Sequence, residues 1–198
     1  MKQKTNNIFN ALKNISYFKA ALCLLLISIG IILVRILPLP MPIIFKMLLI
    51  LPLLSIFVFL FFISMEDAET KMITRWKNIM FITSGIIFYT IRVLYMKTSF
   101  ANIQSETISL VGVFLVLMFL GKIRKWGIGD SLMCTGLIMH YLTLFGHLYI
   151  FITLITIIAA CVIYIFYNII QRIAKKEAFN AFAPYIYISS VLVILFTI

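Results

Sequence analysis

Long apolar runs alternate with short polar segments along the whole chain. Each run is continuously rich in leucine, isoleucine and phenylalanine and lacks the strict polar–apolar alternation of a membrane barrel strand. The runs are close to the roughly 20 residues that a helix needs to cross a bilayer. They predict spans at about 17–37, 43–65, 78–96, 106–121, 131–147, 148–170 and 184–198. The pattern therefore predicts an all-α, polytopic transmembrane helical bundle of about seven spans, the last of them short.

Composition agrees with a membrane protein. Of 198 residues 64% are hydrophobic, and the mean hydropathy is +1.14. About half apolar is usual for a soluble domain, which could not bury this much apolar surface.

The first run has no small-residue cleavage motif and leads into Pro38, so we expect it to remain a span rather than to be a cleaved signal peptide.

The net charge of +11 gives an orientation. In a soluble protein it would suggest nucleic acid, but in a membrane protein basic residues gather in cytoplasmic loops. If the N-terminus is cytoplasmic, all of the 17 lysines and arginines except four fall on that side; the exceptions are Arg35, Lys46, Arg92 and Lys97. We therefore expect a multi-pass protein of the cytoplasmic (inner) membrane, with a cytoplasmic tail at 1–16 and a transmembrane domain at 17–198. Its basic loops, flanked by Trp76 and Trp126, would contact lipid headgroups and no nucleic acid.

Two aspartates stand out among the six acidic residues. Asp67 follows the second span and Asp130 opens the fifth, so the topology puts both at the cytoplasmic membrane edge. Taken singly, Asp130 is adequately explained as a helix cap, a role that Ser131 could share, and Asp67 as a solvated loop residue.

Together, two neighbouring carboxylates suggest chemistry. They share one proton because both cannot ionise cheaply. The ionised member can then deprotonate a water while the protonated member donates to a scissile carbonyl. Such an aspartic endopeptidase uses no metal and no cofactor. The chain has no HExxH helix and no serine-nucleophile motif, which argues against metalloprotease and rhomboid-like alternatives.

The residues around both aspartates resemble a known family. Gly127, Gly129 and Asp130 form the GxGD pattern of the type IV prepilin leader peptidases, a family of membrane aspartic proteases. In that family the first aspartate precedes a basic stretch and an Ile-Pro-Asn-like turn, and Ile73 stands in the same register after Asp67. Two spans separate the aspartates, as in the family. The segment 179–186 is similar to the family's Phe-Gly-Pro-Phe-Leu run, so that the resemblance covers roughly residues 50–198.

The resemblance implies an activity and a substrate. The catalytic pair would be Asp67 and Asp130, and the substrates would be prepilin-like precursors (pilins, preflagellins or tight-adherence pilins) cleaved at the cytoplasmic face. The cysteine-containing insert of the N-methylating members is missing, so cleavage without N-methylation is implied. Thr74 and Arg75 replace the family's proline and asparagine, and Leu132 stands where a lysine is common.

The sequence also leaves other interpretations open. A non-catalytic membrane protein, either a degenerate family member acting in pilus or secretion assembly or a transporter, fits the same composition.

His140 and His147 are seven residues apart, which predicts that both lie on one face of the fifth helix and have a structural or lumen-facing role. An Arg92–Glu106 ion pair is conceivable near the other membrane surface. The substrate-binding residues and the oligomeric state are not indicated.

Overall fold

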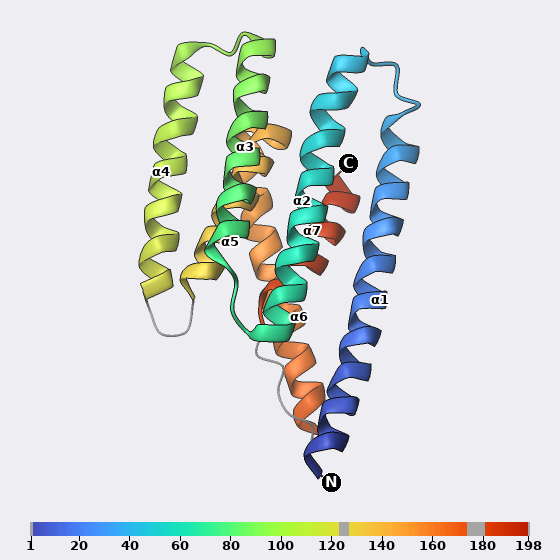
Figure 1. Cartoon of the computed structure of the whole chain (residues 1–198). Helices are drawn as coiled ribbons and strands as arrows, with labels where there is room; N and C mark the ends of the chain where they lie inside the picture. The colour runs from blue at the N-terminus through green and yellow to red at the C-terminus, as the bar shows by residue number, and fades with distance from the viewer. Residues whose placement is uncertain (1, 123–126, 174–180, 198) are drawn as a thin grey trace.

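The described part of the chain is helical. A computed structural model describes residues 2–122, 127–173 and 181–197, and within these ranges it contains helices and turns but no strand. In chain order, the elements are α1 (Lys2–Ile36), α2 (Ile43–Thr70), α3 (Arg75–Met96), α4 (Phe100–Lys122), α5 (Ile128–Phe145), the 3-10 turn η1 (Gly146–Leu148), α6 (Tyr149–Ile173) and α7 (Ala183–Thr197). The predicted all-α class is confirmed (Figure 1).

Five of the described segments are long and apolar enough to cross a membrane. They are Phe18–Ile36, Ile43–Thr70, Arg75–Met96, Phe100–Phe119 and Ile128–Gln171. The fifth segment includes both α5 and α6, which fold back on each other, since the Tyr141 hydroxyl lies 3.2 Å from the Thr156 hydroxyl. The helix α7, with 15 residues, is apolar but shorter than these segments.

The N-terminal residues before the first candidate span are helical. Helix α1 begins at Lys2 and runs without interruption to Ile36, so residues 2–16 continue the helix that holds the first candidate span. Several expectations lie outside the described residues: the anchor Trp126 and the basic residues Arg124, Lys125, Lys175 and Lys176.

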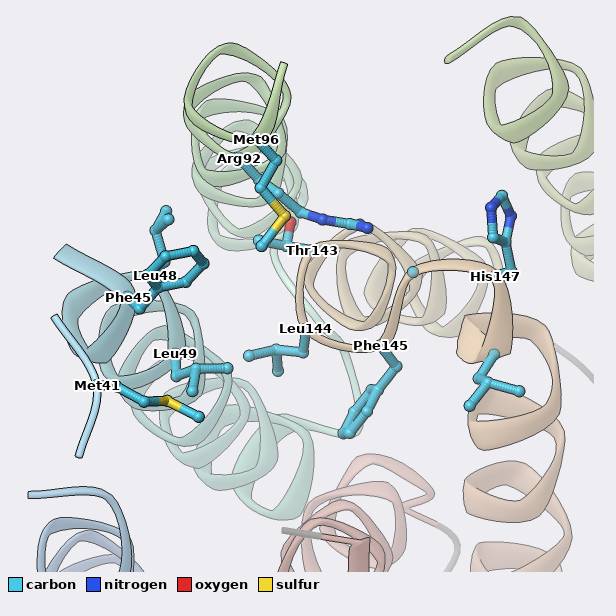
Figure 2. A pocket seen from close by; sticks show the side chains of 12 residues that line it. Met41, Phe45, Leu48, Leu49, Arg92, Met96, Thr143, Leu144, Phe145 and His147 are labelled. Atoms are coloured by element: carbon cyan, nitrogen blue, oxygen red, sulfur yellow. The ribbon is translucent and has the colours of Figure 1, made fainter. Parts of the chain in front are cut away.

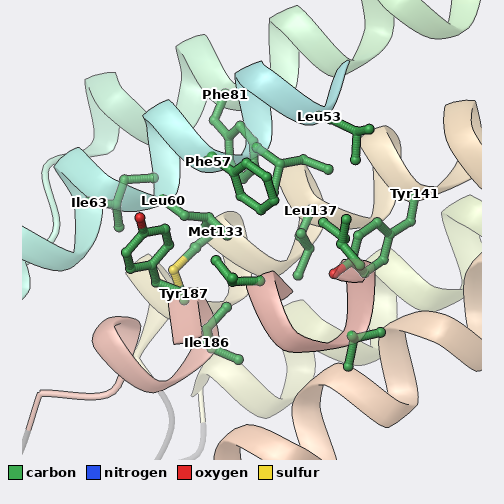
Figure 3. Close-up of a cluster of buried hydrophobic side chains, with 14 of the residues drawn as sticks. Leu53, Phe57, Leu60, Ile63, Phe81, Met133, Leu137, Tyr141, Ile186 and Tyr187 are labelled. Carbon is green, nitrogen blue, oxygen red and sulfur yellow. The ribbon is translucent and has the colours of Figure 1, made fainter. Parts of the chain in front are cut away.

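Helix α5 forms the centre of the bundle. It contacts α2, α3, α4 and α6, and every residue from 133 to 143 is buried. Figure 3 shows side chains of α2, α3, α5 and α7 that meet in one apolar core, among them Phe57, Phe81, Leu137 and Ile186. By contrast, α3 and α4 leave most of their surface uncovered, as expected of helices that face lipid.

Two glycines allow α3 and α5 to pack closely. A Cβ atom on Gly85 would lie 2.6 Å from the Cβ of Met139, and one on Gly136 would overlap the ring of Phe81. Small residues at such crossings let helix backbones approach in a membrane, where packing rather than water exclusion drives association. This contact fixes the start of α5, which includes Asp130, relative to the start of α3.

The two histidines do not share a helix face, so this prediction is wrong. Helix α5 ends at Phe145, and His147 lies exposed in the following turn. His140 is fully buried, with Nδ1 2.8 Å from the carbonyl oxygen of Gly136 and Nε2 2.9 Å from the Ser55 hydroxyl. Because a carbonyl only accepts, Nδ1 donates and Nε2 accepts. His140 thus ties α5 to α2.

Candidate active site

Asp67 lies in the last turn of α2 and is buried, with 6% of its surface exposed. Its Oδ2 accepts a hydrogen bond of 2.9 Å from the backbone N–H of Ala183, and the N–H of Phe182 also donates to the carboxylate. Both donors lie at the N-terminus of α7, where helix N–H groups have no partner within the helix. Asp67 therefore caps α7 from across the bundle, and the expectation of a solvated loop residue is wrong.

Asp130 occupies the first turn of α5 and is half-buried. Its Oδ2 accepts a 3.2 Å hydrogen bond from the N–H of Gly127, the residue that caps the helix. Ser131 does not share this capping role, because its hydroxyl donates to the carbonyl oxygen of Leu117 on α4, 2.8 Å away. Within the described residues, only one of the two carboxylate oxygens of Asp130 accepts a hydrogen bond.

The structure brings the two aspartates to the same end of the bundle. Figure 1 shows that α2 ends and α5 begins at the end opposite the turns from α1 to α2 and from α3 to α4. Two aspartates that are far apart in the sequence are thus placed at one end of the bundle, one at the end of α2 and the other at the start of α5.

Gly129 is the point where the two aspartate-bearing segments meet. The Nδ2 of Asn78, on α3, donates a 3.0 Å hydrogen bond to the carbonyl oxygen of Gly129. A Cβ atom on Gly129 would lie 3.2 Å from the Cβ of Ile73, so a larger residue would push Ile73 away. The segment that follows Asp67 therefore packs against the residue that precedes Asp130. Gly127, in contrast, is exposed, and a Cβ there would mainly approach the carboxylate of Asp130.

A carboxylate next to Asp67 holds the turn between α2 and α3. The Oε2 of Glu66 accepts hydrogen bonds of 3.1 Å from both the N–H and the hydroxyl of Thr74, and it lies 3.2 Å from the Nζ of Lys77. Proline has no N–H, so the residue expected from the resemblance could not form the first of these bonds. Thr74 is therefore part of a hydrogen-bonded turn in place of a proline-fixed one.

Sequence reasoning missed three elements of this site. Asn78 is fully buried, and its Oδ1 has no hydrogen-bond partner within the described residues. The signal available in the sequence was an asparagine at the first position of a predicted apolar span, since asparagine is mostly found on protein surfaces. Glu66 drew no attention because an acid in a polar loop is ordinary. The role of the α7 N-terminus was signalled only by the similarity of the segment 179–186, of which residues 181–186 are described.

The structure also places the other residues that the sequence analysis singled out. Trp76 is exposed at the start of α3, and Leu132 is half-buried. Among the described residues no ion pair joins Arg92 to Glu106; Glu106 instead accepts a 2.6 Å hydrogen bond from the Tyr89 hydroxyl and lies 3.8 Å from Nδ1 of His147.

The described side chains around the aspartates offer carboxylates and backbone donors. Within residues 2–122, 127–173 and 181–197, no group of three or more histidine, cysteine, aspartate or glutamate residues is placed to hold a metal ion. Acid–base catalysis by paired carboxylates requires two carboxyl groups that share one proton, and the residue types for such a pair are present at this end of the bundle in Asp67 and Asp130.

The chain was compared with protein-family models, curated proteins and solved structures. No protein-family model, no curated protein and no solved structure matches it.

Proposed function

We propose that the chain is a membrane aspartic endopeptidase that removes the leader of prepilin-like precursors. The observation that carries this proposal is the placement of Asp67 and Asp130, which come from separate helices to one end of an apolar bundle. The GxGD pattern at Gly127, Gly129 and Asp130 and the register of Ile73 support the assignment to prepilin peptidases.

The proposed hydrolysis uses one proton that the carboxyl groups of Asp67 and Asp130 share. The ionised carboxylate takes a proton from a water molecule, and the water oxygen attacks the scissile carbonyl carbon. The protonated carboxyl group gives its proton to the carbonyl oxygen, so that a neutral tetrahedral intermediate forms. Its collapse breaks the C–N bond: the carboxyl group that took the water proton passes it to the leaving amine, and the other carboxylate takes back a proton from a hydroxyl group of the intermediate, which becomes the new carboxylic acid. The pair returns to one proton, without a metal or a cofactor.

The topology proposed with this function has seven spans, with α5, α6 and the shorter α7 each crossing once and the N-terminus in the cytoplasm. Under this topology the aspartates face the cytoplasm at the inner membrane, where the polar leader of a precursor would lie beside its hydrophobic helix. One of the lysines near the site, Lys77, is paired with Glu66. This pairing reduces the repulsion that a basic leader would meet there.

A non-catalytic membrane protein is the second candidate, and one specific observation favours it. Each aspartate already has a structural role, because Asp67 caps α7 and Asp130 accepts the N–H of Gly127. A degenerate family member could keep both residues for these caps and act only in pilus or secretion assembly.

Co-expression with a prepilin-like precursor distinguishes the two candidates. We expect the wild type to shorten the precursor, and Asp67→Asn and Asp130→Asn each to slow cleavage by at least about 100-fold, the usual scale for loss of an acid–base group. Asparagine keeps an oxygen that can accept the capping N–H, so the fold should persist, which thermal unfolding of the purified variants checks.

Glu69→Gln is the matched control, since Glu69 is an exposed acid in the same turn of α2 as Asp67. It should cleave like the wild type. Cleavage that survives both aspartate substitutions contradicts the proposed mechanism. A folded wild type that leaves every pilin-like precursor tested intact favours the non-catalytic candidate.

A further inference from the structure

An apolar cavity lined by one arginine lies at the end of the bundle opposite the aspartates. There α2, α3, the C-terminal end of α5 and the turn after it line an open cavity of about 460 Å³ (Figure 2). Its lining is mainly apolar: Phe45, Leu48, Leu49, Met96, Leu144 and Phe145. The α2 side chains come from the first two turns of that helix, whereas Asp67 lies in its last turn, so the cavity and the candidate active site are separate.

One cation lines this apolar cavity. Figure 2 shows the side chain of Arg92 extending from α3 toward the end of α5, above Thr143. Its Nη1 donates to the carbonyl oxygen of Leu142, which is one function of this residue. A guanidinium has five N–H donors, however, and this is the only hydrogen bond that Arg92 makes to the described part of the chain.

The charge of Arg92 has no counter-ion within the part of the chain that the structure describes. Among the described residues no carboxylate lies within 4.0 Å of it, and Glu106 is engaged by Tyr89 and His147. An unpaired, partly buried charge is unfavourable in a membrane-spanning segment, and arginines there commonly pair with a ligand or with another charge. The guanidinium therefore calls for an anionic partner from outside the chain.

Two other cations lie at the same end of the bundle and can be compared with Arg92. Arg35 donates to the carbonyl oxygen of Leu195, at 2.7 Å, and Lys46 donates to that of Leu37, at 2.6 Å, so both also bond to carbonyls at helix ends. Both of these bonds are exposed, whereas the Arg92 bond is partly buried beside the cavity. Helix capping is thus common to all three cations, and only Arg92 combines it with an apolar cavity.

We propose that this cavity binds one acyl chain of an anionic phospholipid whose phosphate pairs with Arg92. The chain would lie between Leu49 and Leu144, which point toward one another in Figure 2. The volume lies within the roughly 300–1,000 Å³ of ordinary ligand sites. Guanidinium and phosphate oxygens form bidentate, charge-assisted hydrogen bonds.

A lipid accounts for both features of the cavity at once. A free phosphate ion would gain the guanidinium but would lose water against apolar walls, whereas an acyl chain fills those walls at no such penalty. The membrane also supplies the lipid at high local concentration. This site is independent of the proposed peptidase activity, and neither result bears on the other.

The test compares lipid retention by the full chain in detergent. Dioleoylphosphatidylglycerol or dioleoylphosphatidylcholine is added, and protein–lipid complexes are counted by native mass spectrometry. We expect the wild type to retain the anionic lipid preferentially and Arg92→Gln to weaken its binding about tenfold, the scale of one charge-assisted hydrogen bond. Arg92→Lys should keep part of the preference, and Arg35→Gln, an exposed cation at the same end, should keep all of it.

Filling the cavity tests the second half of the proposal. Leu144→Trp leaves Arg92 in place but occupies the space for the chain, so it should reduce retention of the anionic lipid. Thermal unfolding in phosphatidylcholine alone checks that each variant is folded.

Three outcomes overturn the proposal. Equal losses with Arg92→Gln and Arg35→Gln indicate attraction by bulk charge. Unchanged lipid retention in Arg92→Gln, together with lower stability in both lipids, leaves Arg92 as a helix cap alone. Displacement of the lipid by millimolar inorganic phosphate, with Leu144→Trp binding as the wild type does, indicates a free-anion site.

Discussion

The Oδ2 of Asp67 lies 2.9 Å from the backbone nitrogen of Ala183, a residue 116 positions later in the chain. This contact joins the last turn of α2 to the first turn of α7. One of the two candidate catalytic carboxylates is thus oriented by the N–H groups at the start of a helix, which favour a negative charge. The position of Asp67 depends on α7 as much as on its own helix.

We therefore expect Asp67→Ala to lower stability more than Asp67→Asn. Alanine leaves the N–H of Ala183 without its acceptor in a buried place, which costs about 1–3 kcal/mol. Asparagine retains an oxygen and should lose less. Thermal unfolding of both variants in the same detergent measures the difference, and equal stability of the two would show that the contact contributes nothing to the fold.

Thr74 and Glu66 offer a test of the turn that follows Asp67. Thr74→Pro removes one hydrogen bond through the N–H and another through the hydroxyl, so we expect a loss of about 1–3 kcal/mol. In a Glu66→Gln background the same substitution should be less harmful, because the charged acceptor is already gone. A double-mutant cycle of unfolding free energies measures this coupling. Additive effects would indicate that Thr74 does not act through Glu66.

Asn78 should affect catalysis through the backbone of Gly129. Asn78→Ala removes the 3.0 Å bond to the Gly129 carbonyl, and Asn78→Asp removes the donor when ionised while keeping the size. If the peptidase proposal holds, both variants should lower kcat more than they change KM, because Asp130 is misplaced while the substrate still binds.

Asn102→Ala is the control for this pair, as Asn102 is exposed on α4. It should cleave precursor as the wild type does. A rise in KM at unchanged kcat in Asn78→Ala would instead assign Asn78 to substrate binding.

Substitution of glycine by alanine should have opposite effects on stability at the crossing of α3 and α5 and at glycines that have open space around them. Gly136→Ala places a Cβ against the ring of Phe81, and such overpacking costs about 1–3 kcal/mol. Gly30→Ala and Gly112→Ala meet no atom within 4 Å and lie inside helices, so we expect each to stabilise by about 0.5–1 kcal/mol. Thermal unfolding of the three variants checks the order. Similar changes in all three would contradict the close packing at Gly136.

The apolar runs along the chain are sufficient to predict the all-α class of the protein and most of its helices. Runs of apolar residues as long as a bilayer is thick leave the backbone few choices, since every N–H and C=O must be paired within a helix. The expected third span, 78–96, therefore corresponds to α3 at Arg75–Met96. The same local pattern placed Asp67 and Asp130 at helix ends, because each follows or precedes an apolar run.

What those ends contact depends on how the helices pack in three dimensions. The capping of α7 by Asp67, the bond from Asn78 to Gly129 and the bond from Arg92 to Leu142 beside a cavity all join residues distant in sequence. Periodicity reports which residues are buried but not the helix against which they are buried. The partner of a polar group depends on how the helices pack, and that packing places Asp67 and Asp130 at one end of the bundle and Arg92, beside an apolar cavity, toward the other end.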